Sequence, residues 1–234
     1  MTTITSLIEL QNVSKAYSLG DGTMYQSLYG ITLKINEGEF VAIVGPSGSG
    51  KSTTMHILGA IDLPSTGRYL FKGRDISQYS SDELAEIRNK EIGFVFQSFN
   101  LLPRTTVYKN VERPMLYGGV PAQEREKRVY EALSLVDLTD KAQNLSNQLS
   151  GGQIQRVAVA RAIIMNPRLI LADEPTGNLD TKTSSEIMSL FKKLHQKQGS
   201  TVIVITHEPD IAHLAERVIK IVDGKIVSDA SLVN

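Results

Sequence analysis

The stretch Gly45-Pro46-Ser47-Gly48-Ser49-Gly50-Lys51-Ser52 decides the fold of this chain. It fits the pattern G-x-x-x-x-G-K-[ST], in which the backbone N–H groups of a glycine-rich loop surround a phosphate. The apolar run 40–44 precedes it and predicts a buried strand, and residues 53–58 predict the first turns of a helix. A strand, a glycine-rich loop and a helix in this order predict a phosphate site at the positive helix N-terminus.

Within this loop, Lys51 is expected to reach the β- and γ-phosphates of a nucleotide, and the Ser52 hydroxyl to complete a Mg²⁺ shell. The alternative is a glycine-rich turn that binds nothing, but the flanking strand and helix favour phosphate binding. The predicted nucleotide contacts of the loop are Gly45, Pro46, Ser47, Gly48, Ser49, Gly50, Lys51, Ser52 and Thr53.

The composition limits the classes of function. The 234 residues include 25 basic and 25 acidic side chains, so bulk charge gives no support for a nucleic-acid partner. There is no cysteine, which excludes disulfides and cysteine-ligated metals. The start lacks a basic n-region, and no run approaches the ~18 apolar residues of a membrane span. We therefore expect a soluble, cytosolic chain that acts on a membrane only through a partner.

Strands and helices alternate along the chain. Residues 7–15 and 28–35 alternate in polarity, with a turn at 20–22 between them, and predict an antiparallel β layer beside the nucleotide site. Tyr17 in this layer could stack on adenine, or it could be ordinary edge-strand packing. A turn is expected at 63–67.

A second group of apolar runs predicts a mostly parallel sheet covered on both faces. Its buried strands are expected at 92–96, 169–173 and 201–206, a helix at 181–198, and a hairpin at 217–227 around Asp223-Gly224. Residues 98–165 predict an inserted helical block within a core formed by 1–97 and 166–234. Its helices are expected at 122–136 and 152–164, and an earlier one is expected to break at Pro114.

Polar side chains follow three of the buried strands: Gln97, then Asp173 with Glu174, then His207. Because ligands bind at the carboxyl ends of the strands of such sheets, these groups should meet Lys51 at one edge. Asp173 is placed to hold Mg²⁺, and Glu174 to activate an attacking water. The Gln97 amide could contact the water or the metal, and His207 the γ-phosphate.

Each of these groups also has a plainer interpretation. Asp173-Glu174-Pro175 is a common helix-start sequence, and Gln97 alone could be a solvated loop residue. His207-Glu208 could suggest zinc, but the next histidine, His213, is too far along for the pattern H-E-x-x-H.

The stretch Leu149-Ser150-Gly151-Gly152-Gln153 predicts a second exposed helix N-terminus that could receive an anion. Ser150 is expected to cap this helix, and a well-capped helix without a ligand is the alternative. The candidate nucleotide contacts are Ser150, Gly151, Gly152 and Gln153. The chain would then have two phosphate-binding helix ends but only one set of the other residues that a nucleotide site needs. This indicates a dimer, in which this helix end faces the nucleotide of the other copy.

These motifs together resemble the ATPase subunits of ABC transporters over nearly the whole chain. The matching stretches are residues 45–52 with Walker A, Gln97 with the Q-loop, 149–153 with the ABC signature and 169–173 with Walker B. The resemblance makes Glu174 the catalytic glutamate and His207 the switch histidine. It matches Asn178-Leu179-Asp180 to the D-loop, which adds Asp180 to the nucleotide contacts, and Tyr17 to the adenine-stacking aromatic.

The resemblance implies a P-loop (RecA-like) α/β core with an antiparallel β subdomain and an inserted helical subdomain. It implies an ATPase that uses Mg²⁺ and dimerises around two ATP to drive membrane permease subunits from the cytoplasmic side of the membrane. A periplasmic adaptor would be a further partner, and no nucleic acid is expected.

Residues 94–103 and 173–180 look most like the lipoprotein-release and macrolide-export group. One departure is Ile154, where this group usually has glutamine; Ser150, Gly152 and Gln153 are unchanged. One alternative is a soluble ABC ATPase acting on ribosomes or DNA, although such members carry two cassettes or long coiled coils. Another is a small-molecule kinase, which does not explain residues 149–153. The transported substrate is not indicated.

Overall fold

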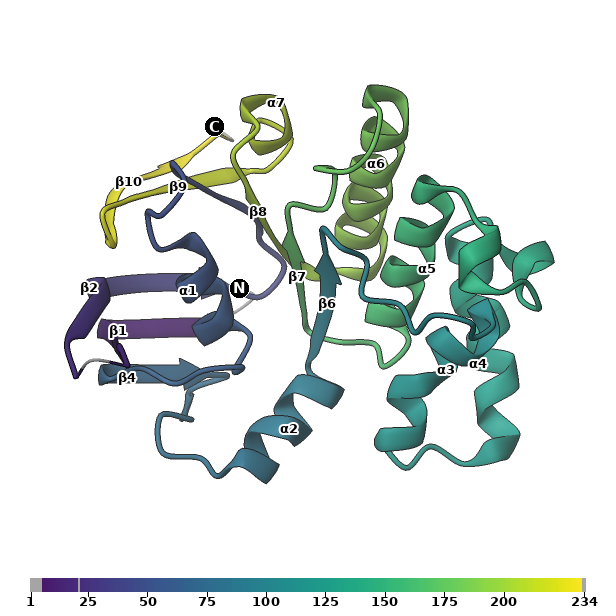
Figure 1. Cartoon of the computed structure of the whole chain (residues 1–234), viewed down its shortest axis with the longest axis horizontal. Helices are drawn as coiled ribbons and strands as arrows, with labels where there is room; N and C mark the ends of the chain where they lie inside the picture. The colour runs from purple at the N-terminus through teal and green to yellow at the C-terminus, as the bar shows by residue number, and fades with distance from the viewer. Residues whose placement is uncertain (1–5, 21, 233–234) are drawn as a thin grey trace, which may run out of the picture.

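The structure is a computed structural model that describes residues 6–20 and 22–232. Asp21, in the predicted turn at 20–22, lies outside the described residues. A smaller and a larger sheet lie side by side, and most of the helices lie on the side of the larger sheet that faces away from the smaller one (Figure 1).

The larger sheet has the strand order β10-β9-β3-β8-β7-β6. All neighbours in it are parallel except β10, which pairs antiparallel with β9. The strands are β3 (Phe40–Val44), β6 (Ile92–Phe96), β7 (Leu169–Asp173), β8 (Thr201–Thr206), β9 (Arg217–Val222) and β10 (Lys225–Ser231). The predicted mostly parallel sheet is confirmed, and strands 40–44, 92–96, 169–173 and 201–206 have the predicted bounds.

This sheet is apolar on both faces, as its sequence predicts. In β3, Val41 and Ile43 belong to one apolar cluster and Phe40 and Ala42 to another. The first cluster joins the sheet to helix α1 (Lys51–Leu58) and the smaller sheet, and the second joins it to the helices of the other face. The two faces therefore fix the sheet rigidly between two layers.

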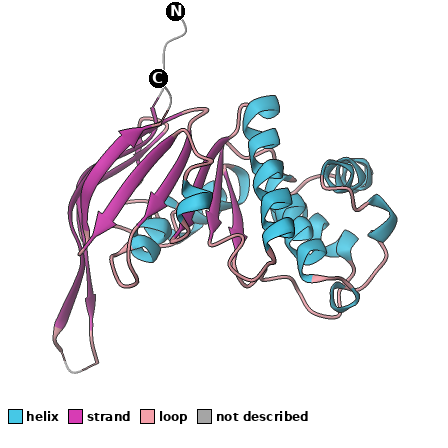
Figure 2. Ribbon diagram, turned by 90° about the horizontal axis from the view of Figure 1, so that it is seen from above, coloured by secondary structure: helices cyan, strands magenta, loops and turns pink. Residues whose placement is uncertain are grey.

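The smaller sheet is antiparallel, with the order β2-β1-β4-β5. Its strands are β1 (Ser6–Ser18), β2 (Met24–Asn36), β4 (Thr66–Phe71) and β5 (Arg74–Asp75). The predicted antiparallel layer is confirmed, and its first two strands are longer than expected. The hairpin of β1 and β2 extends well beyond the rest of the sheet (Figure 2).

The predicted turn at 63–67 is partly wrong, because β4 already begins at Thr66. Gly67 has φ 88, and a Cβ there would lie 2.4 Å from the carbonyl oxygen of Asn12. Glycine is therefore needed at this point of β4 because the bulged part of β1 comes so close to it.

The second layer is helical. It contains α3 (Val107–Tyr117), α4 (Ala122–Leu135), α5 (Gly151–Ile163) and α6 (Thr181–Gln198), and α2 (Ser81–Lys90) and the short α7 (Pro209–Ala212) lie at the margins of the sheet (Figure 1). Two short 3₁₀ turns, Thr139–Lys141 and Ser146–Gln148, connect α4 to α5. The helix predicted at 181–198 has these bounds, and those predicted at 122–136 and 152–164 differ by single residues. Treating residues 98–165 as an inserted subdomain stays a prediction.

The predicted break at Pro114 is wrong, because α3 continues through it. A proline inside a helix costs about 3 kcal/mol. Val111 and Met115 on either side of it are fully buried among the helices, and burial of one such side chain contributes about 1.5–3 kcal/mol. Thr106 caps the helix through the N–H of Lys109, so tertiary packing outweighs the local preference.

No helix within residues 6–20 and 22–232 has the length and hydropathy needed to cross a bilayer.

Candidate nucleotide site

The loop between β3 and α1 forms one wall of the candidate site. α1 begins after Gly50, which has φ 101, and no side chain of the described residues caps it. The N–H groups of its first turn are thus available to a ligand, and they carry the positive end of the helix dipole. This arrangement fits a phosphate group.

The loop is closed on one side and open on the other. A Cβ at Gly45 would lie 2.1 Å from the carbonyl oxygen of Ile221 in β9, so the loop rests directly on the sheet. At Gly48, which has φ 75, a Cβ would meet nothing within 4 Å. The open side leaves the space that an anion needs next to backbone N–H groups.

Lys51 holds the loop together. Its ammonium group donates to the carbonyl oxygens of Gly45 at 2.7 Å and Pro46 at 2.9 Å. An ammonium has three donors, so one remains for a phosphate oxygen.

A cavity of about 740 Å³ opens beside this loop. The register of the sheet explains which side chains reach it, since Phe96 is paired with Asp173 and Asp173 with Ile205. The residues that follow these strand ends therefore stand level at one edge. The predicted site residues that line the cavity are Pro46, Ser47, Gly48, Gly50, Lys51, Ser52, Thr53, Gln97, Asp173, Glu174 and His207. Gly45 and Ser49 do not line the cavity and lie on the side of the loop that packs against the protein. Ser49 is 2% exposed, and its backbone carbonyl accepts a hydrogen bond from the N–H of Gly224.

Asp173 stands at the end of β7 in a poorly solvated place. Burial, and next to it the charge of Glu174, raise the pKa of Asp173, while His56 and Lys51 oppose the rise. Among the described residues, no group of three or more His, Asp or Glu side chains is arranged to hold a metal alone. Asp173, Ser52 and Gln97 offer hard oxygen ligands that fit Mg²⁺ if phosphate oxygens complete the shell.

Glu174 is held in a fixed position. Its backbone has φ 43, a left-handed value that is strained in a residue with a side chain, and its N–H donates to Ile205 O at 2.8 Å. One carboxylate oxygen accepts from Nδ1 of His207 at 2.7 Å, and the other from the Thr206 hydroxyl at 3.3 Å. The hydrogen bond and the negative charge of Glu174 raise the pKa of His207.

Gln97 connects the end of β6 to the segment that follows Glu174. The side chain of Asn178 donates to the Gln97 carbonyl oxygen at 2.9 Å, and the Gln97 amide lies 3.5 Å from the Asn178 side-chain oxygen. This pairing was not predicted from the sequence. Gln97 and Asn178 each lie in a motif that follows a buried strand, and the adjacency of those two strand ends is the signal that could have indicated it.

Tyr17 does not line this cavity, but Tyr25 does. The two tyrosines are directly paired across the β1–β2 hairpin, so they lie on the same face of it. Nζ of Lys15 lies 5.0 Å from the centre of the Tyr17 ring. Tyr25 and Ser27, which also line the cavity, were not predicted as site residues. The hairpin pairing with Tyr17 is the signal that could have indicated Tyr25.

The second predicted phosphate site lies outside the cavity. Ser150 caps α5: its hydroxyl accepts from the Gln153 N–H at 3.4 Å, and its own N–H donates to the Gln153 side chain at 3.0 Å. Gly151 and Gly152 form the first turn of this helix. Capping, which the sequence predicted for Ser150, is therefore present.

Asp180 caps the neighbouring helix α6. Its carboxylate accepts from the backbone N–H of Thr183 at 3.0 Å and from the Thr183 hydroxyl at 2.6 Å, and these bonds lower the pKa of Asp180. A Cβ at Gly152 would lie 2.5 Å from Cγ2 of Thr183, so the starts of α5 and α6 nearly touch. The two capped helix ends form one exposed surface.

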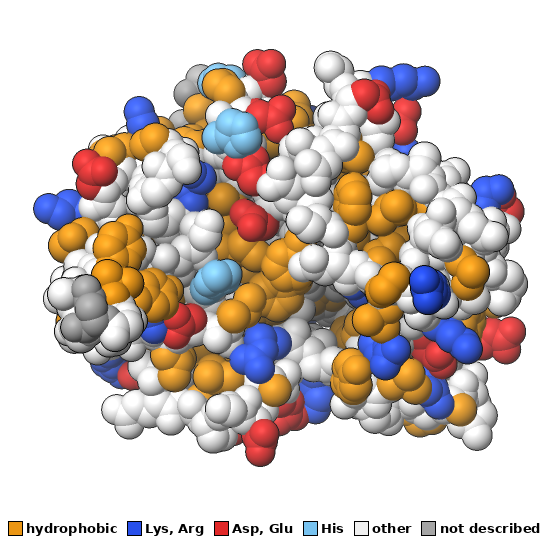
Figure 3. All heavy atoms as spheres, viewed as in Figure 1, with side chains coloured by type: hydrophobic (Ala, Val, Ile, Leu, Met, Phe, Trp, Pro, Cys, Tyr) orange, Lys and Arg blue, Asp and Glu red, His pale blue; other side chains and the backbone are white. Residues whose placement is uncertain are grey.

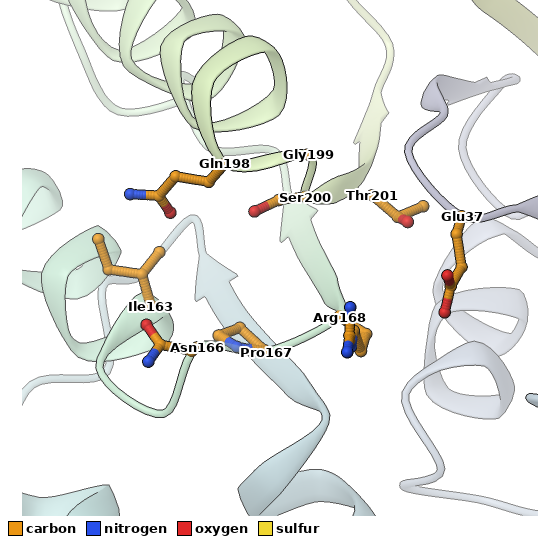
Figure 4. A pocket seen from close by; sticks show the side chains of 9 residues that line it. All are labelled: Glu37, Ile163, Asn166, Pro167, Arg168, Gln198, Gly199, Ser200 and Thr201. Carbon is orange, nitrogen blue, oxygen red and sulfur yellow. The ribbon is translucent and has the colours of Figure 1, made fainter.

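Another cavity, of about 410 Å³, lies at the opposite edge of the parallel sheet, where β7 and β8 begin (Figure 4). Its charged lining residues are Glu37 and Arg168, and the other polar ones include Asn166, Gln198 and Ser200. It has no glycine-rich loop and no paired carboxylates. The chemistry expected from the sequence is concentrated at the other edge.

Comparisons with known proteins agree with this geometry. The profile of the family described as "ABC transporter" matches residues 28–177, which is more than half of the chain. An uncharacterized ABC transporter ATP-binding protein of Bacillus subtilis (strain 168), YknY, is 52% identical over 225 residues, covering 96% of this chain and 97% of that protein. The macrolide export ATP-binding/permease protein MacB of Brucella melitensis is 51% identical over 225 residues. These residues are 96% of this chain but 34% of MacB, so the chain spans about a third of that relative.

The chain is also similar to solved structures of ABC transporter cassettes. The dimeric structure of MJ0796, a bacterial ABC transporter cassette, matches with a TM-score of 0.88 and 45% identity over 97% of this chain and 99% of that one. A second MJ0796 structure, described as a post-hydrolysis state bound to ADP and Pi, also matches with a TM-score of 0.88, at 44% identity over the same shares.

Proposed function

The chain belongs to the ABC transporter family and is an ATP-binding, ATP-hydrolysing cassette, and we propose that two copies of it enclose two Mg-ATP at a shared interface. One observation carries the proposal. Lys51 and Glu174 line one cavity, whereas Ser150 caps an exposed helix end outside it. A nucleotide in the cavity would meet such a helix end only if a second copy supplied it. The dimeric form of the MJ0796 cassette supports this arrangement.

Each copy would bind the phosphates through its own loop. Lys51 and the free N–H groups of α1 would hold the β- and γ-phosphates, and Tyr17 and Tyr25 lie on the hairpin face where the base could be placed. Ser52 and Asp173, with Gln97 close by, would hold Mg²⁺, which when bound would neutralise negative charge at the phosphates. Ser150, Gly151, Gly152 and Gln153 of the partner subunit would close the site, with Asp180 beside them.

Glu174 would accept the proton of the attacking water. Its carboxylate is held by Thr206 and His207, which fixes its direction. Since Nδ1 of His207 contacts Glu174, Nε2 is left to face the γ-phosphate. Lys51 and His207 would then stabilise the charge that develops on the γ-phosphate as its bond to ADP breaks.

A membrane permease is the second proposed partner. An apolar groove of about 570 Å³ lies between α2, β6, α3 and α5, and the space-filling view shows hydrophobic side chains gathered between the β half and the helical half (Figure 3). Ile61 and Tyr117 line the groove and are 46% and 74% exposed. Asn100, shortly after Gln97, also lines it, so closure of the nucleotide site could be transmitted there.

The name of MacB supports the permease partner, because it joins an ATP-binding part to a permease in one chain. The chain would then act at the cytoplasmic side of a membrane. Export of a macrolide, peptide or lipoprotein is the transport class we propose, with a periplasmic adaptor as a further partner. Action on ribosomes or DNA is not supported, because the relatives are ABC transporter ATP-binding proteins and MacB proteins.

Replacement of the proposed base tests the function. In Glu174→Gln, we expect kcat for ATP hydrolysis to fall about 100-fold or more, because general-base catalysis contributes about 10²–10⁴. ATP should still bind, and a closed dimer should accumulate, measured by sedimentation with saturating Mg-ATP. Adding Ser150→Ala to this variant should remove the dimer. A normal rate in Glu174→Gln, or a strictly monomeric protein, contradicts the proposal.

A further inference from the structure

A buried amide on α5 connects the signature helix to the segment that carries Glu174. Gln155 is 0% exposed, and its side-chain Nε2 donates to the carbonyl oxygen of Pro175 at 2.7 Å. The amide orientation follows from chemistry, since a carbonyl acceptor requires the NH₂ group to face it. Pro175 directly follows Glu174, so this bond holds the peptide next to the proposed base.

Packing alone does not account for glutamine at this position. The side-chain oxygen of Gln155 is buried and has no hydrogen-bond partner among the described residues. A buried acceptor without a partner is unfavourable, and an apolar side chain of similar volume would avoid it. The amide is therefore best explained by what its NH₂ group holds.

The segment that Gln155 holds is strained, and near Glu174 it is also bonded to residues at the end of β8. Glu174 has φ 43, and its carboxylate is bonded to Thr206 and His207. The Thr176 hydroxyl donates to Glu208 at 2.9 Å. These three bonds reach the segment from the end of β8, whereas Gln155 reaches it from α5. The backbone of Glu174 is therefore clamped between two elements.

We infer that Gln155 is a positioning residue for Glu174, and that it couples the start of α5 to catalysis. The inference rests on the proposed function. Ser150 and Gln155 lie on the same helix within about 8 Å along its axis at 1.5 Å per residue. When Ser150 meets the nucleotide bound to the partner subunit, α5 is held, and Gln155 then fixes Glu174 against the nucleotide of its own chain. In each copy, nucleotide binding at the partner's site thus affects the position of Glu174 at the copy's own site.

Steady-state ATPase kinetics of the full chain test the inference through Gln155→Met, which keeps the volume and removes the donor. We expect kcat to fall roughly 10- to 100-fold, the range caused by misplacing a catalytic group by about 1 Å. KM for ATP should stay within about twofold, because the phosphate loop is unchanged. If Gln155→Met does not fold, Gln155→Asn retains a buried amide that is one methylene too short to reach Pro175. It should likewise lower kcat and leave KM for ATP nearly unchanged.

A double variant separates positioning from general loss of structure. If Gln155 acts through Glu174, adding Gln155→Met to Glu174→Gln should not slow the residual turnover further. Asn110→Leu is the matched control: Asn110 is a buried amide on α3 whose side chain, among the described residues, bonds only within 102–106. It should lower the melting temperature and leave kcat within about twofold.

Two results would overturn the inference. One is an equal fractional loss of kcat from Gln155→Met in the wild-type and Glu174→Gln backgrounds. The other is a kcat in Gln155→Met that equals that of the wild type. In either case a slow Glu174→Gln would leave the proposed function standing, whereas a fast Glu174→Gln would refute that function itself.

Discussion

Glu174 and His207 form the pair on which the proposed chemistry depends most at the level of single residues. His207 has a side chain that is 66% exposed, and its bond to Glu174 raises its pKa above the usual 6.5. A raised pKa means that the folded chain binds the proton more tightly than the unfolded chain. The stabilisation from this pair is then complete below pH 6.5 and is lost as the pH rises through the folded pKa.

NMR titration of His207 checks this assignment. We expect its imidazole pKa to lie above 6.5 in the wild type and to return towards that value in Glu174→Gln, because the amide carries no charge. A His207 titration that does not change in Glu174→Gln would show that the two side chains do not interact in solution.

At the level of elements, the strands of the parallel sheet were predictable because they are buried on both faces. The runs 169–172 and 202–205 within these strands are continuously apolar, which is typical of strands buried on both faces. The hairpin of β9 and β10 was predictable from Asp223-Gly224, and both residues have positive φ.

The elements that were mispredicted depend on contacts from far along the chain. Thr66 and Gly67 resemble a turn locally, but β1 pairs with them and makes them a strand. Pro114 resembles a helix end, but burial of α3 overrides it. Local propensity is a weak guide wherever tertiary packing supplies more free energy.

The contact between β6 and α5 gives a prediction at this scale. A Cβ at Gly93 would lie 2.3 Å from the backbone oxygen of Ala162, which cannot rotate away. Gly93→Ala should therefore lower the free energy of unfolding by about 1–3 kcal/mol, the usual cost of overpacking. Urea denaturation measures this change.

Gly20→Ala is the control for Gly93→Ala, because a Cβ at Gly20 would meet nothing within 4 Å. We expect this variant to change the free energy of unfolding by less than about 0.5 kcal/mol, as is usual for open surface positions. Equal stabilities for the two variants would mean that β6 and α5 are not packed as closely as the structure shows.

At the level of the whole molecule, the sequence predicted the half of the site that one chain forms. Lys51, Gln97, Asp173 and His207 could be placed together because the ends of parallel strands meet at one edge. Tyr25 was not among the predicted residues, since finding it requires the register of β1 with β2, which pairs it with Tyr17. In the proposed dimer, the position of Ser150 relative to a nucleotide depends on a second copy, so residue patterns could indicate a dimer but not its geometry.

Mixed dimers test that geometry directly. Ser150→Ala and Glu174→Gln chains should each turn over ATP slowly by themselves, because every site in either homodimer lacks one group. In a dimer of one chain of each kind, the site with the intact Glu174 meets the intact Ser150, while the other site carries both changes. If the chains pair at random, a mixture in equal amounts made before ATP is added should recover at most about a quarter of the wild-type rate. The rate should lie below that limit if the coupling through Gln155 operates, because the chain with the intact Glu174 lacks Ser150, but it should exceed the mean of the two separate preparations. A site completed within one chain would instead give a mixture no faster than the mean of the two separate preparations.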